Sequence, residues 1–304
     1  MKKTSATVIF FGSGPVAAKS LTLLEQNFTI EAVVTKPRPP HHKGAVPVLE
    51  AAERLNLPIY STADKQALSD LVKNWGVTSK VAVLIDFGVL VPQELIDYFP
   101  LGILNSHFSL LPEWRGADPI TFAILSGQEK TGVSLMLVTA GIDEGPLLAQ
   151  SALTIQPTTT TPSLTEELIN LSDTMLTSLL PKYMDESIKP YPQDLNSPVT
   201  YSRKLHKDDG LINWEKPADQ IEREVRAFVG WPKSRTSFGK IDVIITQVRI
   251  VDYSGKPGTT TIENKLPIVY CGQKALVIEK LKPSGKPEMT GEAFLNGYGE
   301  SFKI

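Results

Sequence analysis

The strongest constraint on the fold is a series of short apolar runs in the first half of the chain, interleaved with segments of helical spacing. The runs cover residues 6–11, 30–35, 81–86 and 103–106, and the helical segments cover 16–24, 46–55 and about 117–126. Strands that are apolar at every position are buried on both faces, and strands that alternate with helices usually form parallel sheets. We therefore expect a doubly wound α/β domain.

The second half of the chain has a different pattern. Two further strands are expected at 132–138 and 147–155, and a long helix is expected to begin at Thr161-Pro162, where a hydroxyl residue precedes proline. Residues 187–202 contain three prolines and little periodicity. Beyond them, a helix at 216–229 precedes short strand-like runs typical of a small barrel or sandwich, at 235–238, 243–251, 267–271 and 275–281. We expect domains at 1–188 and 203–304, with a linker at 189–202.

Length and composition agree with two ordinary globular domains. The chain has 304 residues, of which 41% are hydrophobic and 21% are charged. Its apolar runs are too short to cross a membrane, and the first is followed by glycines, so neither a membrane span nor a signal peptide is expected. Cys271 is the only cysteine, which excludes an intramolecular disulfide and a cysteine-based metal cage. We expect a cytoplasmic protein.

The charge is distributed unevenly between the two halves. Residues 201–304 carry 17 Lys and Arg against 13 Asp and Glu, whereas residues 1–200 carry 14 against 20. A positive C-terminal part within a chain of net charge −2 favours an anionic partner for that part.

A glycine-rich turn follows the first expected strand. Gly12-x-Gly14-x-x-Ala17, with Glu31 near the end of the next strand, satisfies a loose dinucleotide fingerprint. Pro15, however, removes a backbone N–H at the step where a pyrophosphate would bind. We therefore favour a tight turn. A nicotinamide-dependent oxidoreductase remains an alternative that only this turn supports.

The remaining histidines outside the central segment give little indication of a site. His41 and His42 lie in a proline-rich basic loop without a neighbouring acidic or cysteine ligand, which favours an exposed loop over a metal site. Arg38 and Lys43 in that loop are candidates for contact with an anionic substrate. His206 is expected at the surface.

The segment "ILNSHFSLLPEWRGADP" is the strongest candidate site. Asn105 and His107 are two residues apart at the end of an expected strand, so their side chains can point to the same side. Asp143 lies in "AGIDEGP", a turn between two expected strands. An amide can stabilise an oxyanion, and an imidazole with a carboxylate can exchange protons. Residue types and spacing alone leave open whether these residues are catalytic or a hydrogen-bonded structural pair.

Several segments resemble one family. "NSHFSLLPEWRGADPITFAI" resembles the Asn-x-His-x-Ser-Leu-Leu-Pro-x-x-Arg-Gly signature of the folate-dependent formyltransferases, and "TGVSLMLVTAGIDEGPLL" resembles their second signature. "FFGSGPVAAKSL" resembles the family's N-terminal turn, and "DFGVLVPQELID" resembles its segment along the folate pocket. "YSRKLHKDDGLINWEKPADQIEREVRAFVGWPKSRTSF" and "GEAFLNGYG" resemble the C-terminal domain of the members that act on initiator tRNA. The resemblance covers nearly the whole chain.

The resemblance implies a fold and a reaction. It implies a Rossmann-like catalytic domain, a C-terminal OB-like β-barrel that binds tRNA, and transfer of a formyl group from 10-formyltetrahydrofolate to the α-amine of initiator methionyl-tRNA in translation initiation. It implies neither a metal nor a nicotinamide, and we expect a monomer. By position, it implies catalytic Asn105, His107 and Asp143; folate-binding Ser109, Leu110, Leu111, Pro112, Asp86, Phe87 and Gly88; and tRNA-binding Arg38 and Lys43.

The chain departs from the family pattern at a few positions. The basic loop at 36–47 is shorter than usual, and Phe108 replaces the usual proline after the histidine. Asp86-Phe87 replaces a small residue and tyrosine, and Asp118 replaces a small residue. These departures keep a second hypothesis open, namely formylation of an amino sugar nucleotide or another small amine. A non-catalytic RNA-binding protein is a further alternative, in which the Asn105, His107 and Asp143 set would have no purpose.

Overall fold

The computed structural model describes residues 6–41 and 44–302 and divides into two compact units. The first unit comprises Met1–Pro119, Lys130–Thr154 and Thr165–Ser202, and the second comprises Ile120–Glu129, Ile155–Leu164 and Arg203–Ile304. The segment 189–202, whose prolines suggested a linker, therefore belongs to the first unit. Two short segments that precede residue 165, 120–129 and 155–164, belong to the second unit.

The first unit contains a seven-stranded sheet in the order β3-β2-β1-β4-β5-β7-β8. Strands β1 to β5 run parallel, whereas β7 is antiparallel to β5 and β8 is antiparallel to β7. The strands are β1 Thr7–Phe11, β2 Thr29–Thr35, β3 Ile59–Ser61, β4 Ala82–Leu84, β5 Ile103–His107, β7 Lys130–Leu137 and β8 Leu147–Thr154. The strand order reverses next to β1, a point at which sheets of this kind bind ligands beyond the carboxyl ends of the strands.

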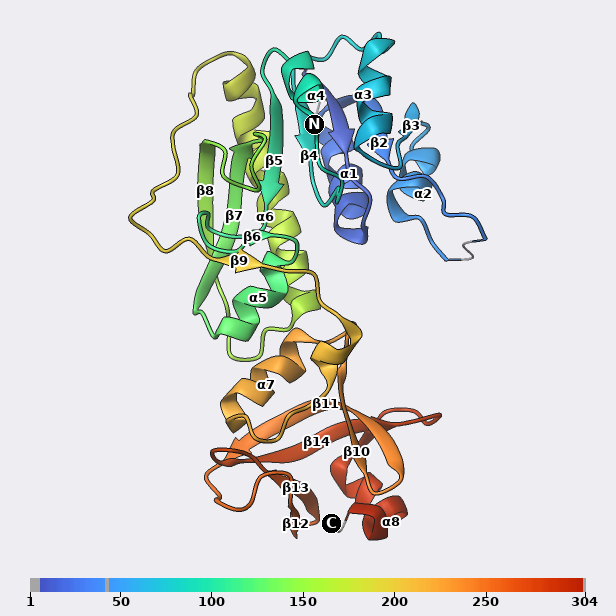
Figure 1. Ribbon diagram of the computed structural model, residues 1–304, viewed down its shortest axis with the longest axis vertical. Helices are drawn as coiled ribbons and strands as arrows, with labels where there is room; N and C mark the ends of the chain where they lie inside the picture. The colour runs from blue at the N-terminus through green and yellow to red at the C-terminus, as the bar shows by residue number, and fades with distance from the viewer. Residues whose placement is uncertain (1–5, 42–43, 303–304) are drawn as a thin grey trace. The chain divides into compact units, whose positions relative to one another are not determined.

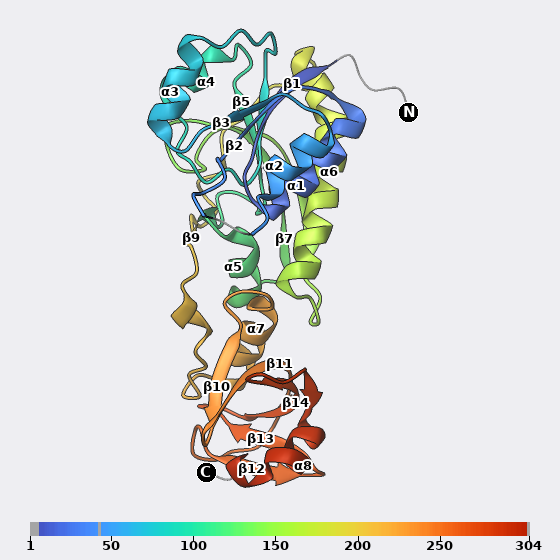
Figure 2. The ribbon, with the colours of Figure 1, turned by 90° about the vertical axis from the view of Figure 1, so that its right-hand side faces the viewer.

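Helices cover both faces of this sheet. Figure 2 shows α1, α2 and α6 on one face and α3 and α4 on the other, which confirms the doubly wound α/β expectation. These helices are α1 Pro15–Asn27, α2 Pro47–Arg54, α3 Lys65–Lys73, α4 Gln93–Tyr98 and α6 Thr161–Met184, and α5 covers Pro119–Ser126. Among the residues that the structure describes, no helix has both the length and the hydropathy needed to cross a membrane.

The core on the α3–α4 face is aromatic. The ring of Phe11 on β1 lies 5.6 Å from that of Phe87, 6.1 Å from that of Trp75 and 6.3 Å from that of Phe99, all in edge-on geometry. Burial of each such ring contributes about 1.5–3 kcal/mol to folding, and the edge-on pairs add to it. This packing anchors the turn after β4 to the core.

The second unit is an antiparallel β domain, as the resemblance predicted (Figure 1). Its main path runs β10-β11-β14-β13-β12, and β15 pairs with β14. Phe238, Phe294 and Phe302 lie in its core. The elements are β10 Ser234–Phe238, β11 Ile241–Val251, β12 Thr260–Glu263, β13 Leu266–Tyr270, β14 Ala275–Pro283, β15 Met289–Thr290, the 3₁₀ turn η1 Lys207–Gly210, α7 Ala218–Ala227 and α8 Gly291–Phe302.

Candidate active site

The carboxyl end of β5 carries two of the predicted catalytic residues. Every residue of this strand is buried, because β4 and β7 pair with its two edges and the sheet is covered by helices. Asn105 and His107 alternate with Ser106, so both side chains leave the same face of the strand. Ser106 points to the other face, where its hydroxyl forms a 2.7 Å hydrogen bond with that of Ser172 on α6.

Asp143 lies against this pair in the turn between β7 and β8. Its carboxylate accepts a 3.3 Å hydrogen bond from Asn105 Nδ2 and a 2.8 Å hydrogen bond from the backbone N–H of Gly116. Asp143 Oδ2 also lies 3.6 Å from Nδ1 of His107. The structure therefore brings together the three residues that the sequence placed in one site.

The other nitrogen of His107 faces a backbone carbonyl. Nε2 lies 3.0 Å from the carbonyl oxygen of Trp114, and because a carbonyl only accepts, Nε2 carries the proton of this hydrogen bond. Trp114 adopts a left-handed backbone with φ of 55°, which is rare for a bulky side chain, and Asp143 is left-handed as well, with φ of 50°. Such backbones concentrate at functional sites, where the surrounding structure must stabilise them.

The site contains groups for proton exchange and oxyanion stabilisation. The Asn105 amide has two N–H bonds, of which Asp143 accepts one within the described part of the chain. Cys271 is poorly suited to act as a nucleophile, because it is buried and burial raises the pKa of its thiol to about 12. The arrangement suits direct attack by an incoming amine rather than a covalent enzyme intermediate.

The backbone of the predicted folate-binding loop 109–112 is held by a buried hydroxyl and a side-chain amide. Ser134 Oγ on β7 donates to the carbonyl of Ser109 at 2.6 Å and accepts from the N–H of Leu111 at 3.0 Å. Gln150 Nε2 on β8 donates to the carbonyl of Leu111 at 2.8 Å and to Ser134 Oγ at 2.9 Å. Ser109, Leu111 and Pro112 are buried, whereas Leu110 is only partly buried.

The other predicted folate-binding segment, 86–88, follows β4. Phe87 is buried in the aromatic core, whereas Asp86 and Gly88 are exposed. Although Asp86 keeps an exposed surface, burial among the surrounding protein atoms raises the pKa of its carboxyl to about 6, with opposing charge effects from Lys36 and Asp118. Lys36 Nζ donates a 3.0 Å hydrogen bond to the carbonyl of Gly88.

The glycine-rich turn after β1 is occupied by protein groups. A Cβ on Gly14 would lie 1.8 Å from Oδ2 of Asp86, so the carboxylate lies directly against the start of α1. Glu31, the acidic residue of the loose dinucleotide fingerprint, accepts hydrogen bonds from the backbone N–H and hydroxyl groups of Thr78 and Ser79. Burial raises the pKa of Glu31, but these hydrogen bonds outweigh it and lower the pKa overall. Both observations agree with a tight turn.

The basic loop is described only in part. Lys43 and His42 lie outside the described residues. Arg38 is exposed and donates to the carbonyl of Gly44 at 3.2 Å and to Glu50 at 3.4 Å. His206 is exposed, as expected. No group of three His, Cys, Asp or Glu side chains within residues 6–41 and 44–302 is arranged to hold a metal ion.

Phe108 and Asp118 depart from the family signature, and the structure shows the surroundings of both. Phe108 is buried, with 6% of its surface exposed, so it contributes to the packed interior. Asp118 is partly buried, and its backbone N–H donates a 3.0 Å hydrogen bond to Ser202 Oγ.

Sequence reasoning missed the residues that hold the site together. Ser134, Gln150 and Thr200 bind the backbone of the signature loop, and Gln193 binds the backbone of the Asp143 turn. Thr200 and Gln193 lie in the segment interpreted as a linker. Only their positions in the folded chain reveal the role, because no spacing or composition signal marks an isolated Gln or Thr in a proline-rich segment.

Comparison with known proteins identifies the family. The formyl transferase family matches residues 6–180, and the formyl transferase C-terminal domain family matches residues 204–299. A methionyl-tRNA formyltransferase from Roseiflexus castenholzii is 35% identical over 294 residues, covering 93% of this chain and 93% of that protein. One from Pseudoalteromonas translucida is 35% identical over 303 residues, covering 95% of this chain and 93% of that protein.

Solved structures share the fold at lower identity. The N-formyltransferase from Helicobacter canadensis, in complex with folinic acid and dTDP-3-aminofucose, has a TM-score of 0.67 at 18% identity and covers 90% of this chain and 99% of that one. HypX from Aquifex aeolicus, in complex with tetrahydrofolic acid, has a TM-score of 0.64 at 14% identity and covers 98% of this chain and 47% of that one. Together with the full-length relatives, the two domain matches show that this chain is a formyltransferase and belongs to the methionyl-tRNA formyltransferase family.

Proposed function

We propose that this chain transfers the formyl group of 10-formyltetrahydrofolate to the α-amine of initiator methionyl-tRNA, with Asn105, His107 and Asp143 as its catalytic residues. The observation that carries the assignment of these residues is the meeting of the Asp143 carboxylate with Asn105 and His107 at the end of β5. The full-length relatives support the choice of acceptor.

The proposed reaction balances without a metal or a redox partner. The amine nitrogen uses its lone pair to form a bond to the formyl carbon, and the carbonyl π electrons move to oxygen. Collapse of this tetrahedral species breaks the bond to N10 of the folate. The amine loses one proton and N10 gains one, so the products are the formylated amine and tetrahydrofolate.

The three side chains suit these steps. The second N–H bond of Asn105 supplies a hydrogen bond to the developing oxyanion. His107, whose Nε2–H donates to the Trp114 carbonyl, adds a second donor only by exchanging that carbonyl for the oxyanion. Asp143, whose Oδ2 lies 3.6 Å from Nδ1 of His107, accepts the proton that the amine loses. Donors that are already in place before the reaction lower the barrier because they need no reorganisation.

The folate would bind beside the loop 109–112 and the turn 86–88. The fixed backbone of the loop and the partly buried side chain of Leu110 offer a rigid, partly apolar surface close to His107 in the chain. Gly88 adds exposed backbone without a side chain. When bound, the folate supplies the activated formyl group, and the protein supplies orientation and hydrogen bonds.

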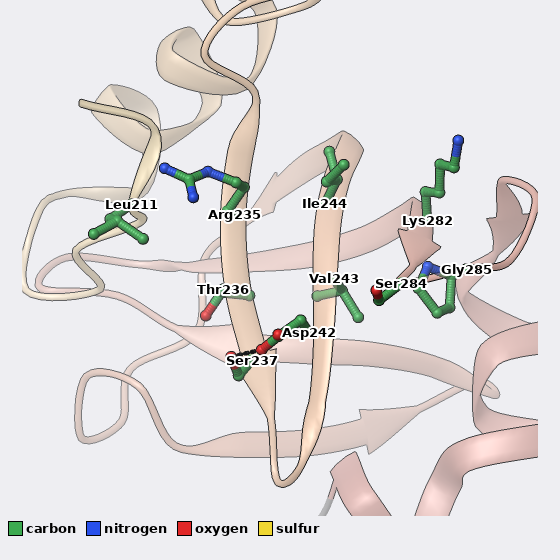
Figure 3. Close-up of a pocket in the computed structure, with 11 residues that line it drawn as sticks. Leu211, Arg235, Thr236, Ser237, Asp242, Val243, Ile244, Lys282, Ser284 and Gly285 are labelled. Carbon is green, nitrogen blue, oxygen red and sulfur yellow. Dashed lines mark hydrogen bonds between the residues drawn. The ribbon is translucent and has the colours of Figure 1, made fainter. Parts of the chain in front are cut away.

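The second unit offers a groove for tRNA, with about 410 Å³ of space (Figure 3). Across β10, β11 and β14, Arg235, Ile244 and Lys282 lie in register, which places two cations on either side of an aliphatic floor. The guanidinium of Arg235 donates to the carbonyl of Lys207, and Asp242 in the same groove accepts a 2.6 Å hydrogen bond from Ser237. Lys282 is therefore the cation best placed to contact a phosphate.

Formylation of an amino sugar nucleotide is the alternative function, because the Helicobacter canadensis enzyme has a similar fold and binds a sugar nucleotide. That likeness, at 18% identity, shows the fold alone, whereas the relatives at 35% identity share the whole chain.

One assay distinguishes these acceptors. The purified protein is incubated with 10-formyltetrahydrofolate and either methionyl-initiator tRNA or a panel of amino sugar nucleotides, and tetrahydrofolate release is followed. We expect release with the charged tRNA and none above background with the sugars. Release with sugars alone would overturn the proposed acceptor, and release with neither would overturn the proposed reaction.

A further inference from the structure

Gln193 makes three hydrogen bonds that join the Asp143 turn to the signature segment. Its Nε2 donates to the carbonyl of Asp143 at 2.8 Å and to the carbonyl of Gly145 at 2.9 Å. Its Oε1 accepts from Nη2 of Arg115 at 2.7 Å. Only 7% of the surface of Gln193 is exposed, so water does not readily replace these bonds.

The orientation of this amide follows from its partners. The guanidinium of Arg115 can only donate, so the amide oxygen must face it, and both N–H bonds then point to the two carbonyls. Arg115 is itself buried, with Glu144 at 3.8 Å and with no hydrogen-bond partner for its Nε among the described residues. The charged donor polarises the amide and strengthens the bonds that it donates.

The Asp143 turn requires such support. Asp143 has a left-handed backbone, and its carboxylate reaches Asn105 and His107 only from that backbone position. On the other side of the turn, a Cβ on Gly145 would lie 1.9 Å from the carbonyl oxygen of Leu137, so the backbone approaches β7 as closely as glycine allows. Gln193 thus holds the turn through the carbonyls of Asp143 and Gly145.

Other residues of the segment 189–202 bind the backbone around the proposed site. Tyr191 exchanges backbone hydrogen bonds of 2.7 and 2.8 Å with Leu147 at the start of β8. Thr200 Oγ1 accepts from the N–H of Trp114 at 2.8 Å, and Trp114 presents its carbonyl to His107. The strand β9, Tyr201–Ser202, pairs with β6, Arg115–Gly116. The segment expected to be a linker therefore binds the backbone of both Trp114 and Asp143, the two residues that face the ring nitrogens of His107.

We infer that Gln193 is a positioning residue for formyl transfer, which acts by holding the Asp143 turn in its left-handed form through the carbonyls of Asp143 and Gly145. The inference rests on the proposed function, because it needs Asp143 to be catalytic. It assigns Gln193 no contact with either substrate. Its loss therefore lowers kcat and leaves the KM for folate and for tRNA nearly unchanged.

Two substitutions separate the functions of the amide. Gln193→Leu removes all three hydrogen bonds at similar volume. Gln193→Glu keeps an oxygen for Arg115 but removes the amide donors to the two carbonyls. Asp194→Ala is the matched control, because the exposed Asp194 carboxylate binds only Asn196, in the same segment. We expect kcat to fall about 10²-fold in both Gln193 variants, as for a catalytic group displaced by about 1 Å, and to stay near wild type in Asp194→Ala.

Combination with Asp143→Asn distinguishes positioning from a general structural role. If Gln193 acts through Asp143, adding Gln193→Leu to Asp143→Asn lowers single-turnover rates little further. A full additional loss in the double variant, or wild-type kcat in folded Gln193→Glu, would overturn the inference. Full activity of Asp143→Asn alone would instead overturn the catalytic assignment on which it depends. Gln193→Glu keeps the test open if Gln193→Leu does not fold, because it retains the Arg115 contact.

Discussion

Asn105 and Asp143 are 38 positions apart in the chain, yet the amide of one donates a 3.3 Å hydrogen bond to the carboxylate of the other. Asn105 lies on β5, the fifth strand of the sheet, and Asp143 lies in the turn that joins the two antiparallel strands added beside it. The site therefore exists only when β7 and β8 have joined the parallel part of the sheet. Substitutions in the supporting backbone should affect catalysis before they affect overall folding.

Gly116 provides a test of that dependence. Its N–H binds the Asp143 carboxylate, its φ is 109°, and a Cβ there would lie 2.5 Å from the carbonyl oxygen of Ser202. We expect Gly116→Ala to lower stability by about 1–3 kcal/mol because of the strained backbone, and to lower kcat further than this loss of folded protein explains. Urea titration and formylation kinetics on the same preparation measure the two effects.

Gly76→Ala is the control for this substitution. Gly76 is exposed, and a Cβ there would meet nothing within 4 Å. Its stability and kcat should match those of the wild type. Equal kcat in Gly116→Ala and Gly76→Ala would show that the Gly116 contact does not position Asp143.

The carboxyl of Asp86 should make stability depend on pH in an unusual direction. Burial raises its pKa to about 6 in the folded protein, above about 3.9 in an unfolded chain, so the folded state binds the proton more tightly. The corresponding stabilisation is complete below about pH 3.9 and is lost as the pH rises through 6. The free energy of unfolding of Asp86→Asn relative to that of the wild type should therefore be higher at pH 7.5 than at pH 4.5.

Urea midpoints of the two proteins at both pH values measure this change. The charged groups that act on Asp86 are Lys36, which favours its ionised form, and Asp118, which opposes it. Asp118→Asn should consequently reduce the pH dependence of the wild type without abolishing it. A difference between wild type and Asp86→Asn that stays constant with pH would contradict the raised pKa.

Lys282 in the groove of the second unit is expected to contact tRNA phosphate. Lys282→Glu should weaken tRNA binding at all salt concentrations and reduce the slope of log Kd against log salt by about 1. Lys256→Glu carries the same change of charge on an exposed loop residue of the same unit, outside the groove. Identical slopes for the two variants would place the phosphate contact elsewhere.

The fold was predictable where strands are apolar throughout. The runs at 6–11, 30–35 and 103–106 correspond to β1, β2 and β5, because strands buried on both faces leave a continuous signal. The elements β3, α3 and α4 were not predicted, since they are short, with three, nine and six residues. Helix α8 was also missed, because three of its residues are glycine, which disfavours helices in isolation.

The site was predictable in its residues but not in its support. Asn105 and His107 could be identified because polar side chains are unusual at the end of an apolar strand. Asp143 could be identified because it lies in a glycine-flanked turn between two expected strands. The proline-rich segment that contains Gln193 looks like a linker by composition. Its hydrogen bonds to the Asp143 turn arise from tertiary structure, which local sequence does not encode.

Formylation kinetics of Asn105→Ala and Asp143→Asn test the central claim most directly. Both side chains lie in the cluster, and Asp143→Asn retains an oxygen to accept from Gly116, so folding should be preserved and is checked by circular dichroism. With 10-formyltetrahydrofolate and methionyl-initiator tRNA, we predict that kcat falls by about 10²–10³ in each variant. Turnover near wild type in either folded variant would contradict the assignment of this cluster as the catalytic site.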